Sequence, residues 1–249
     1  MIELMVATAT ASLIVTAMLT FYARQRVMFK SAAETLGAFS NASDALSLVA
    51  EAARRAAPSL APPSRLRDRP YQAVFACDGA QVTGPWDQPT CGPARARLGD
   101  GVQFAHSAGS TCRLSDAGSD TDVGIDGMDI EFDASRWFVR EFPATRLPEL
   151  YCLGRGDRAS QPMVSGIDTL RIRHGIRSDG VSRSASATTS PEGPMLEGLD
   201  LCVTARGRAD ERAMSYVDCE GQRIALADRT ARTVLGGWVA IRSGSAPWR

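Results

Sequence analysis

The first 23 residues constrain the fold of this 249-residue chain more than any other segment. From Leu4 to Ala23 the sequence runs through twenty residues without a charge, and a helix needs about 20 residues to cross the hydrocarbon core of a membrane. Hydroxyl side chains interrupt this run, but in a helix they can hydrogen bond to carbonyls of the preceding turn. A cleavable secretory signal is the alternative, but no basic segment precedes the apolar run, which is longer than such a signal needs. We therefore expect a retained membrane span over residues 4–23.

The helical pattern continues past the span to Ala57, because no proline occurs before Pro58. Apolar or small residues recur mostly three or four positions apart, at Met28, Ala32, Leu36, Phe39, Leu46, Val49 and Ala53. The pattern predicts one helix over residues 2–57, about 84 Å long. We expect the stripe formed by Leu36, Phe39, Leu46 and Val49 to pack on the domain that follows.

Residues 58–249 predict a mainly β domain, so the expected fold class is α+β. Four prolines between positions 58 and 70 end the helix, and residues 177–195 form a loop rich in serine, glycine and proline. Short apolar runs predict strands at 72–76, 128–132, 136–142, 167–173, 199–205, 222–226 and 237–242. Within 167–174, Leu170, Ile172 and His174 alternate with polar residues, which is typical of a half-buried antiparallel strand.

The six cysteines predict disulfides and an oxidising compartment. They are Cys77, Cys91, Cys112, Cys152, Cys202 and Cys219, and no two form a C-x-x-C pair. With two histidines in the whole chain, clustered zinc ligands are not expected. Six cysteines allow about fifteen pairings. Short, turn-rich stretches favour Cys77–Cys91 and Cys202–Cys219, which leaves Cys112 and Cys152 to close the longer middle loop, while buried free thiols are the alternative.

The basic residues that follow the span and the cysteines predict opposite orientations of the chain in the membrane. Arg24, Arg26 and Lys30 alone would place the C-terminal side in the cytoplasm by the positive-inside rule. Disulfides, however, persist in oxidising compartments such as the periplasm. We give the cysteines more weight and expect a periplasmic head on a single-pass inner-membrane anchor.

The sequence gives little support to catalysis, a cofactor or bulk nucleic-acid binding. His106 and His174 lie in no recognisable catalytic motif, and 28 basic residues balance 28 acidic ones, whereas nucleic-acid binders usually carry a basic excess. In the acidic stretch 116–133, Asp120, Asp122 and Asp126 form a weak calcium candidate. The stretch departs from the EF-hand template, which favours a solvated acidic loop. We expect no enzyme activity and no small-molecule substrate.

The N-terminal sequence Met1-Ile2-Glu3-Leu4-Met5-Val6-Ala7 closely resembles the start of mature type IV pilins, F-T-L-I-E-L-M-V-A. A second resemblance lies in the C-terminal half, where residues 161–167 and 170–176 are similar to the "QPLVEGVE-LQVRYGV" segment of PilW-type minor pilins. Residues 150–152, 229–234 and 239–242 also fit that family. Between residues 58 and 150 the similarity is diffuse.

The resemblance implies a lollipop-shaped α+β protein with a membrane and assembly helix at 1–57 and a periplasmic head at 58–249. It further implies a structural minor pilin at or near the tip of a type IV pilus, which primes assembly. Its partners would be other minor pilins, the major pilin, the inner membrane before assembly and the pilus assembly platform. Glu3 would set axial register by pairing with a neighbour's N-terminal amine. A minor pseudopilin of a type II secretion system is the alternative, and a membrane-anchored periplasmic binding protein is a third.

Overall fold

A computed structural model of the chain describes residues 2–56, 74–94, 98–107, 112, 132–178, 181–186, 195–209, 215–228 and 230–241. The proline-rich segment 58–70 lies outside these residues, as do the calcium candidates Asp120, Asp122 and Asp126. The strand predicted at 128–132 falls outside them except for Phe132. The loop predicted at 177–195 is described in part, and that part corrects the prediction: residues 177–178 end one strand and Val181–Ser186 form the next.

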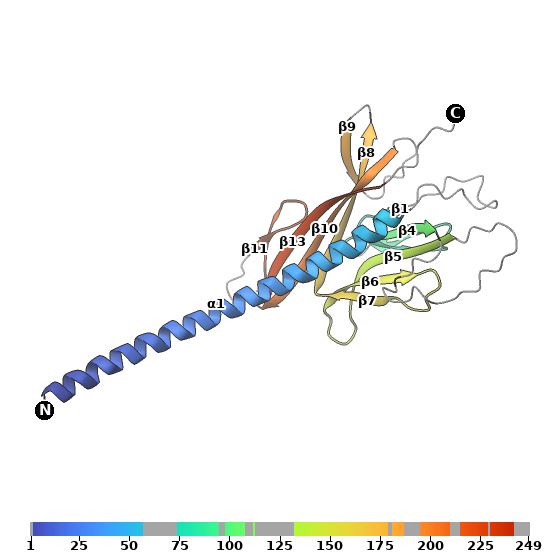
Figure 1. Cartoon of the computed structure of the whole chain (residues 1–249). Coiled ribbons are helices and arrows are strands. Elements are labelled where there is room, and N and C mark those ends of the chain that lie inside the picture. Colours follow the sequence, from blue (N-terminus) through green and yellow to red (C-terminus); the bar gives the residue numbers. More distant parts are fainter. Residues whose placement is uncertain are drawn as a thin grey trace.

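One uninterrupted helix, α1 (Ile2–Arg55), opens the chain and confirms the predicted long helix. Its 54 residues correspond to about 81 Å. The hydroxyls in its apolar part bond within the helix as expected: Thr8 donates to the carbonyl of Leu4 at 3.1 Å, and Ser12 donates to that of Thr8 at 2.7 Å. The N-terminal half projects away from the rest of the molecule, whereas the C-terminal half lies along the sheets (Figure 1).

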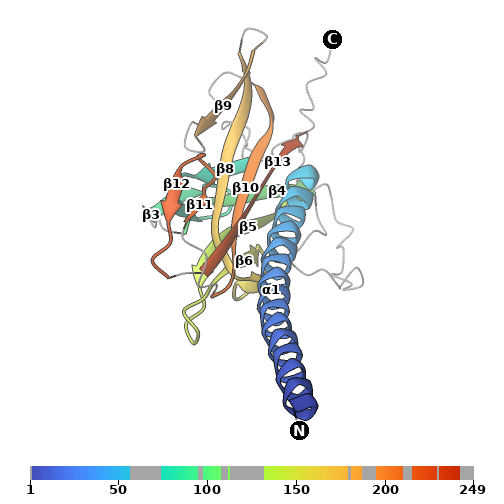
Figure 2. The ribbon, with the colours of Figure 1, turned by 90° about the vertical axis from the view of Figure 1, so that its left-hand side faces the viewer.

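The head contains two main antiparallel sheets. The five-stranded sheet has the order β1 (Val74–Cys77), β4 (Gly101–Ser107), β5 (Phe132–Glu141), β6 (Pro148–Gly154) and β7 (Gln161–Ser165). The four-stranded sheet has the order β13 (Thr230–Ala240), β10 (Met195–Ala209), β8 (Ile167–Ser178) and β9 (Val181–Ser186). The described part of the head also contains two hairpins, β2 (Ala80–Thr83) with β3 (Thr90–Ala94) and β11 (Ser215–Val217) with β12 (Arg223–Ala225). The predicted α+β fold of a long helix packed on an antiparallel β head is confirmed (Figure 2).

A short junction joins the two sheets through Gly99 and Asp100. Gly99 forms a parallel bridge with Leu170 of β8, and the Asp100 carboxylate accepts hydrogen bonds from the backbone amides of Gly79 at 2.8 Å and Ile172 at 2.7 Å. Arg171 donates to the same carboxylate at 3.1 Å. Burial, partly offset by these donors, raises the pKa of Asp100. The junction therefore ties the β1–β2 turn to β8 with one buried carboxylate.

The helix packs on the head through alanines, which corrects part of the sequence prediction. Its buried face consists of Ala38, Ala42, Ala45, Val49, Ala50, Ala52 and Ala53. Val49 belongs to this face, and Leu46 packs partly buried against the same core. Leu36 and Phe39, however, remain 67% and 51% exposed. The prediction was wrong for these two residues because small side chains let a helix approach a sheet closely, so the larger ones turn outward.

The cysteines form the three pairs that the loop lengths predicted. Cys77 bonds Cys91, Cys112 bonds Cys152, and Cys202 bonds Cys219, with Cα–Cα distances of 5.5, 5.8 and 5.8 Å. These separations lie in the ordinary range for disulfides. The first bond links the end of β1 to β3, and the last attaches the β11–β12 hairpin to β10.

Candidate assembly surface

The exposed surface of α1 is the first candidate functional feature. The helix is long and apolar enough to cross a membrane, by length and composition, and none of its most apolar stretch is buried against the head. Large apolar side chains cover this part, including Leu4, Leu13, Ile14, Leu19 and Phe21, all more than half exposed. Such a surface is unfavourable in water. It is therefore compatible with a single-pass membrane anchor near the N-terminus.

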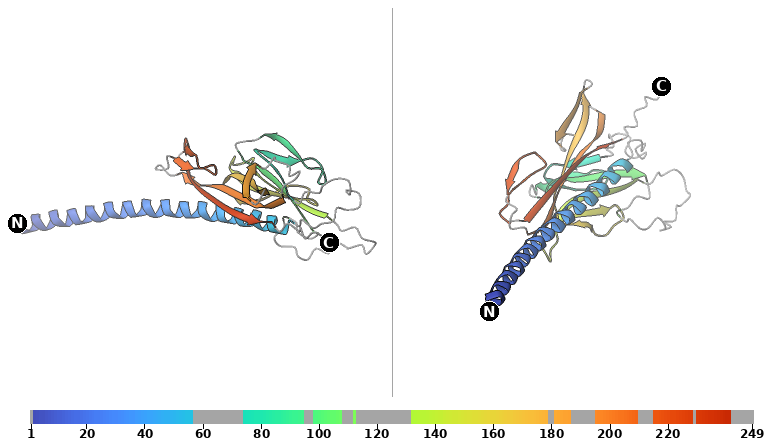
Figure 3. Two further views of the ribbon diagram at one scale, coloured as in Figure 1. Left: turned by 90° about the horizontal axis from the view of Figure 1, so that it is seen from above. Right: turned by 60° about the vertical axis from the view of Figure 1, so that its left-hand side comes forward.

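The apolar surface continues past the span to the level of the head. Met28, Phe29, Leu36 and Phe39 are all more than half exposed. Leu36 lies nine residues before the buried Ala45, which at 3.6 residues per turn places it on the opposite side of the helix. Seen from above, the strands of the head lie on one side of α1 (Figure 3, left). The helix thus carries two faces here, an alanine face for the head and a large apolar face turned away from it.

Glu3 sits in the first turn of α1, at the projecting end of the helix, and is exposed. A carboxylate near a helix N-terminus gains up to about 1 kcal/mol from the helix dipole. Within the hydrocarbon core it would instead cost about 2.5–3.5 kcal/mol on insertion scales, unless a cation neutralises it.

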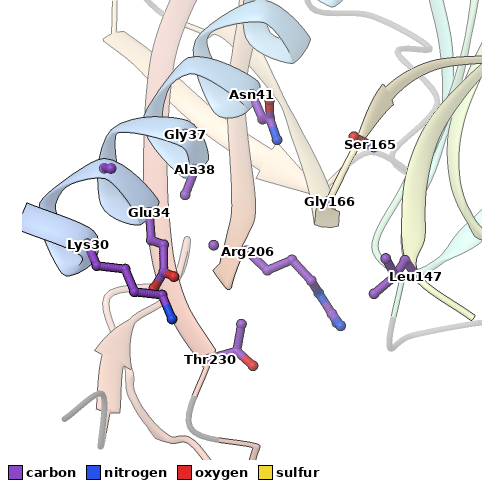
Figure 4. A pocket seen from close by; sticks show the side chains of 12 residues that line it. Lys30, Glu34, Gly37, Ala38, Asn41, Leu147, Ser165, Gly166, Arg206 and Thr230 are labelled. Atoms are coloured by element: carbon purple, nitrogen blue, oxygen red, sulfur yellow. The ribbon is translucent and has the colours of Figure 1, made fainter. Parts of the chain in front are cut away.

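A groove of about 610 Å³ opens where α1 meets the end of the head nearer the membrane span (Figure 4). Lys30, Glu34 and Asn41 project into it from α1, while Arg206 reaches it from β10 and Thr230 from the start of β13. Gly37 lies along its helical wall, and no atom would touch a Cβ placed there. Leu147, Ser165 and Gly166 complete the opposite side. The groove is thus open between the helix and the strand ends.

An ion-pair network behind the groove connects β8 to β10 and β13. Asp168 pairs with both Arg206 and Arg232, and Arg232 also bonds the Asp228 carboxylate at 2.6 Å. Partial burial opposes ionisation of Asp228, but the Arg232 hydrogen bond, the Thr230 amide and nearby positive charge outweigh it and lower the pKa of Asp228. The network holds the ends of three strands in register beneath Thr230.

The structure places the two predicted histidines in the interior of the head. His106 and His174 are both buried in strands, and His174 lies on the core face of β8 with Leu170 and Ile172, as the alternation predicted. Among the described residues, no group of three or more histidine, cysteine or acidic side chains could hold a metal ion.

Sequence reasoning missed the groove and the Asp168 network. The network could not be found from the sequence, because Arg206 and Arg232 are recognised as direct partners across β10 and β13 only once the strand register is known. The groove could not be found either, because its walls come from five separate segments of the chain.

Comparisons with known proteins add one finding. No family model matches the chain, and no curated protein matches it. Among solved structures, the chain is similar to a type IV-like pilin, TTHA1219 from Thermus thermophilus, with 15% sequence identity and a TM-score of 0.36. The match covers 70% of this chain and 84% of that one.

Proposed function

We propose that this chain is a minor pilin, stored in the inner membrane by residues 4–23 and then incorporated at or near the tip of a type IV pilus. The observation that carries the proposal is the outward apolar face of α1, which extends from the span through Phe29, Leu36 and Phe39. A membrane anchor needs apolar surface only across the hydrocarbon, about 20 residues. The additional apolar surface beside the head requires another partner, and the apolar helices of neighbouring pilins provide one.

In this mechanism the same helix serves the subunit first in the membrane and then in the pilus. In the membrane, lipid covers the outward face of its first half while the head, residues 58–249, lies in the periplasm. The disulfides support this compartment. On extraction by the assembly platform, the apolar face exchanges lipid for the helices of the major pilin and other minor pilins. The role is structural and requires no enzyme activity or cofactor.

Glu3 sets the axial position of the subunit during this transfer. Its carboxylate is exposed and unfavourable inside the bilayer, so an N-terminal amine on a neighbouring subunit would be a favourable partner there. The resemblance of residues 2–7 to mature type IV pilins supports this role. The similarity of residues 161–176 to PilW-type minor pilins favours a pilus over a type II secretion system, whose minor pseudopilins are the second candidate.

Incorporation into sheared pili tests the proposal. Phe39→Asp should reduce recovery of the protein in the pilus fraction, because a charge then enters a helix–helix contact. Phe142→Asp is a matched control, since Phe142 is also exposed, at 37%, but lies just after β5 and is not part of the apolar face of α1. Glu3→Ala should insert into membranes at least as well as the wild type and still incorporate poorly. Normal recovery of Phe39→Asp and Glu3→Ala in the pilus fraction would refute the assembly role of the helix.

A further inference from the structure

The outer face of the four-stranded sheet carries an exposed tryptophan. Leu199 and Leu201 of β10 and Val239 of β13 are buried. The residues that alternate with them therefore point away from the core. The helix lies on the core side, because a Cβ on Gly237 would meet the Leu46 side chain at 3.6 Å. Trp238 consequently projects from the side opposite α1, and it remains 52% exposed.

The indole ring of Trp238 rests directly on the backbone of two neighbouring strands. A Cβ on Gly175 of β8 would lie 1.8 Å from its Cη2 atom, and one on Gly198 of β10 would lie 2.6 Å from its Cζ2 atom. Neither distance is possible for a real side chain, so both positions need glycine if the ring keeps its place. Glycine inside a strand weakens a sheet and often marks a close approach. These two glycines hold the ring in one position while half of the side chain stays open.

Two charged residues lie beside the ring on the same face of the sheet, because the ring covers the partner pair Gly198 and Gly175, two residues along the strands from Asp200 and Arg173. Asp200 of β10 is the direct strand partner of both Trp238 and Arg173 of β8. Arg173 points outward because its neighbours Ile172 and His174 are buried. With strands about 4.8 Å apart, the row from Trp238 to Arg173 spans about 10 Å. Within the described part of the chain, no hydrogen bond or ion pair occupies the side chains of Asp200 and Arg173.

The β11–β12 hairpin covers the next part of this face and stops short of the row. The Cys202–Cys219 disulfide attaches the hairpin to β10, and the Thr204 hydroxyl lies 3.8 Å from the Cys219 sulfur. Asp200 lies two residues before Cys202, toward the start of β10, and Trp238 is its direct partner on β13.

We propose that the row of Trp238, Asp200 and Arg173 is a carbohydrate-binding site. The electron-rich face of an indole attracts the C–H groups of a sugar ring, while a carboxylate accepts and a guanidinium donates hydrogen bonds to sugar hydroxyls. A sugar ring stacked on the indole would therefore have both charged side chains along one edge. A nucleic acid fits less well, because the Asp200 carboxylate beside the ring would repel phosphates. The ligand is therefore a short neutral glycan segment.

Isothermal titration tests this site on the full chain in phosphatidylcholine nanodiscs, which avoid detergents with sugar headgroups. The probes are maltotriose, cellotriose, chitotriose and mannotriose, with a ten-residue oligothymidine as a polyanion. At least one trisaccharide should bind, and the oligothymidine should not. Trp238→Ala should weaken sugar binding about tenfold or more, as expected for a lost aromatic stacking contact. Gly175→Ala should do the same, because the new Cβ displaces the ring while the tryptophan remains.

The controls separate a binding role from a purely structural one. Trp86→Phe changes a partly buried tryptophan between β2 and β3 and should leave the affinity unchanged. Asp200→Asn removes no large side chain, so it should preserve the melting temperature and still weaken binding several-fold. If Trp238→Ala fails to fold, Asp200→Asn still tests the binding site. Failure of all four trisaccharides to bind, preferential binding of the oligothymidine, or unchanged affinity in Asp200→Asn and Gly175→Ala would overturn the proposal.

Discussion

The same charge introduced on the two faces of α1 should lower the stability of the protein by very different amounts. Ala45 is completely buried, whereas Leu36 is 67% exposed on the other side of the helix. Ala45→Asp places a carboxylate in the core cluster, which contains apolar side chains from the helix and both sheets. An unpaired buried charge costs about 4 kcal/mol or more. Leu36→Asp changes a solvent-facing position, where lower helix propensity costs about 0.5 kcal/mol.

These energies convert into well-separated melting temperatures. For a protein of this size, each kcal/mol shifts the melting temperature by about 2–4 °C. Ala45→Asp should therefore melt about 8–16 °C below the wild type, and Leu36→Asp within about 2 °C of it.

Near-UV circular dichroism of the full chain in nanodiscs is the suitable assay. It reports the packing of aromatic residues such as Trp137, which is buried in the head, and not the helix content of the projecting half of α1. Equal destabilisation by both variants would show that the helix packs through its large residues. Two unchanged melting temperatures would show that the helix is not docked on the head.

Three further predictions concern the stability of the head. Replacing Cys202 and Cys219 with serine should lower the free energy of unfolding by about 3 kcal/mol and raise hydrogen exchange in the β11–β12 hairpin, since their bond closes a separation of 17 residues; unchanged exchange would contradict this. Gly99→Ala should destabilise the protein by more than about 3 kcal/mol in denaturant unfolding, because Gly99 has a φ of 85° and its Cβ would lie 2.1 Å from the Leu170 carbonyl oxygen; Gly221→Ala, with φ 77° and open space, is the control. Burial raises the pKa of Asp100, so its contribution to stability is present below the unfolded pKa and lost as pH rises through the folded pKa; the melting temperature of Asp100→Asn relative to the wild type should therefore increase between about pH 3.5 and 7, and a difference that decreases would refute this.

The strand predictions succeeded where alternation was clear and failed where it was absent. The predicted strands at 136–142, 167–173 and 199–205 overlap β5, β8 and β10. Those at 72–76, 222–226 and 237–242 overlap β1, β12 and β13. β4 was missed because its polar residues Gln103 and His106 are buried like the apolar ones, so the strand has no exposed polar face that the sequence could reveal. β6 was missed because it begins with Pro148, which normally signals a turn.

The candidate sites also differ in how far the sequence alone could predict them. The span and Glu3 are local features of consecutive residues, and they needed no fold to be found. The site formed by Trp238, Asp200 and Arg173 joins three strands, and its residues come together only once the register of β8, β10 and β13 is known. The groove beside Lys30 likewise depends on strand ends that are remote in sequence.

The sequence by itself determined the continuous helix, the membrane-compatible span, the α+β class and the favoured cysteine pairs. Each of these follows from local periodicity, from an unbroken apolar run or from short loop closure. The tertiary structure alone decided which face of the helix meets the head. Hydrophobicity ranks Leu36 and Phe39 above the alanines as core residues, but a helix packed closely on a sheet needs small side chains at the contact. The alanines therefore became the core, and the large side chains were left outward, where a partner can cover them.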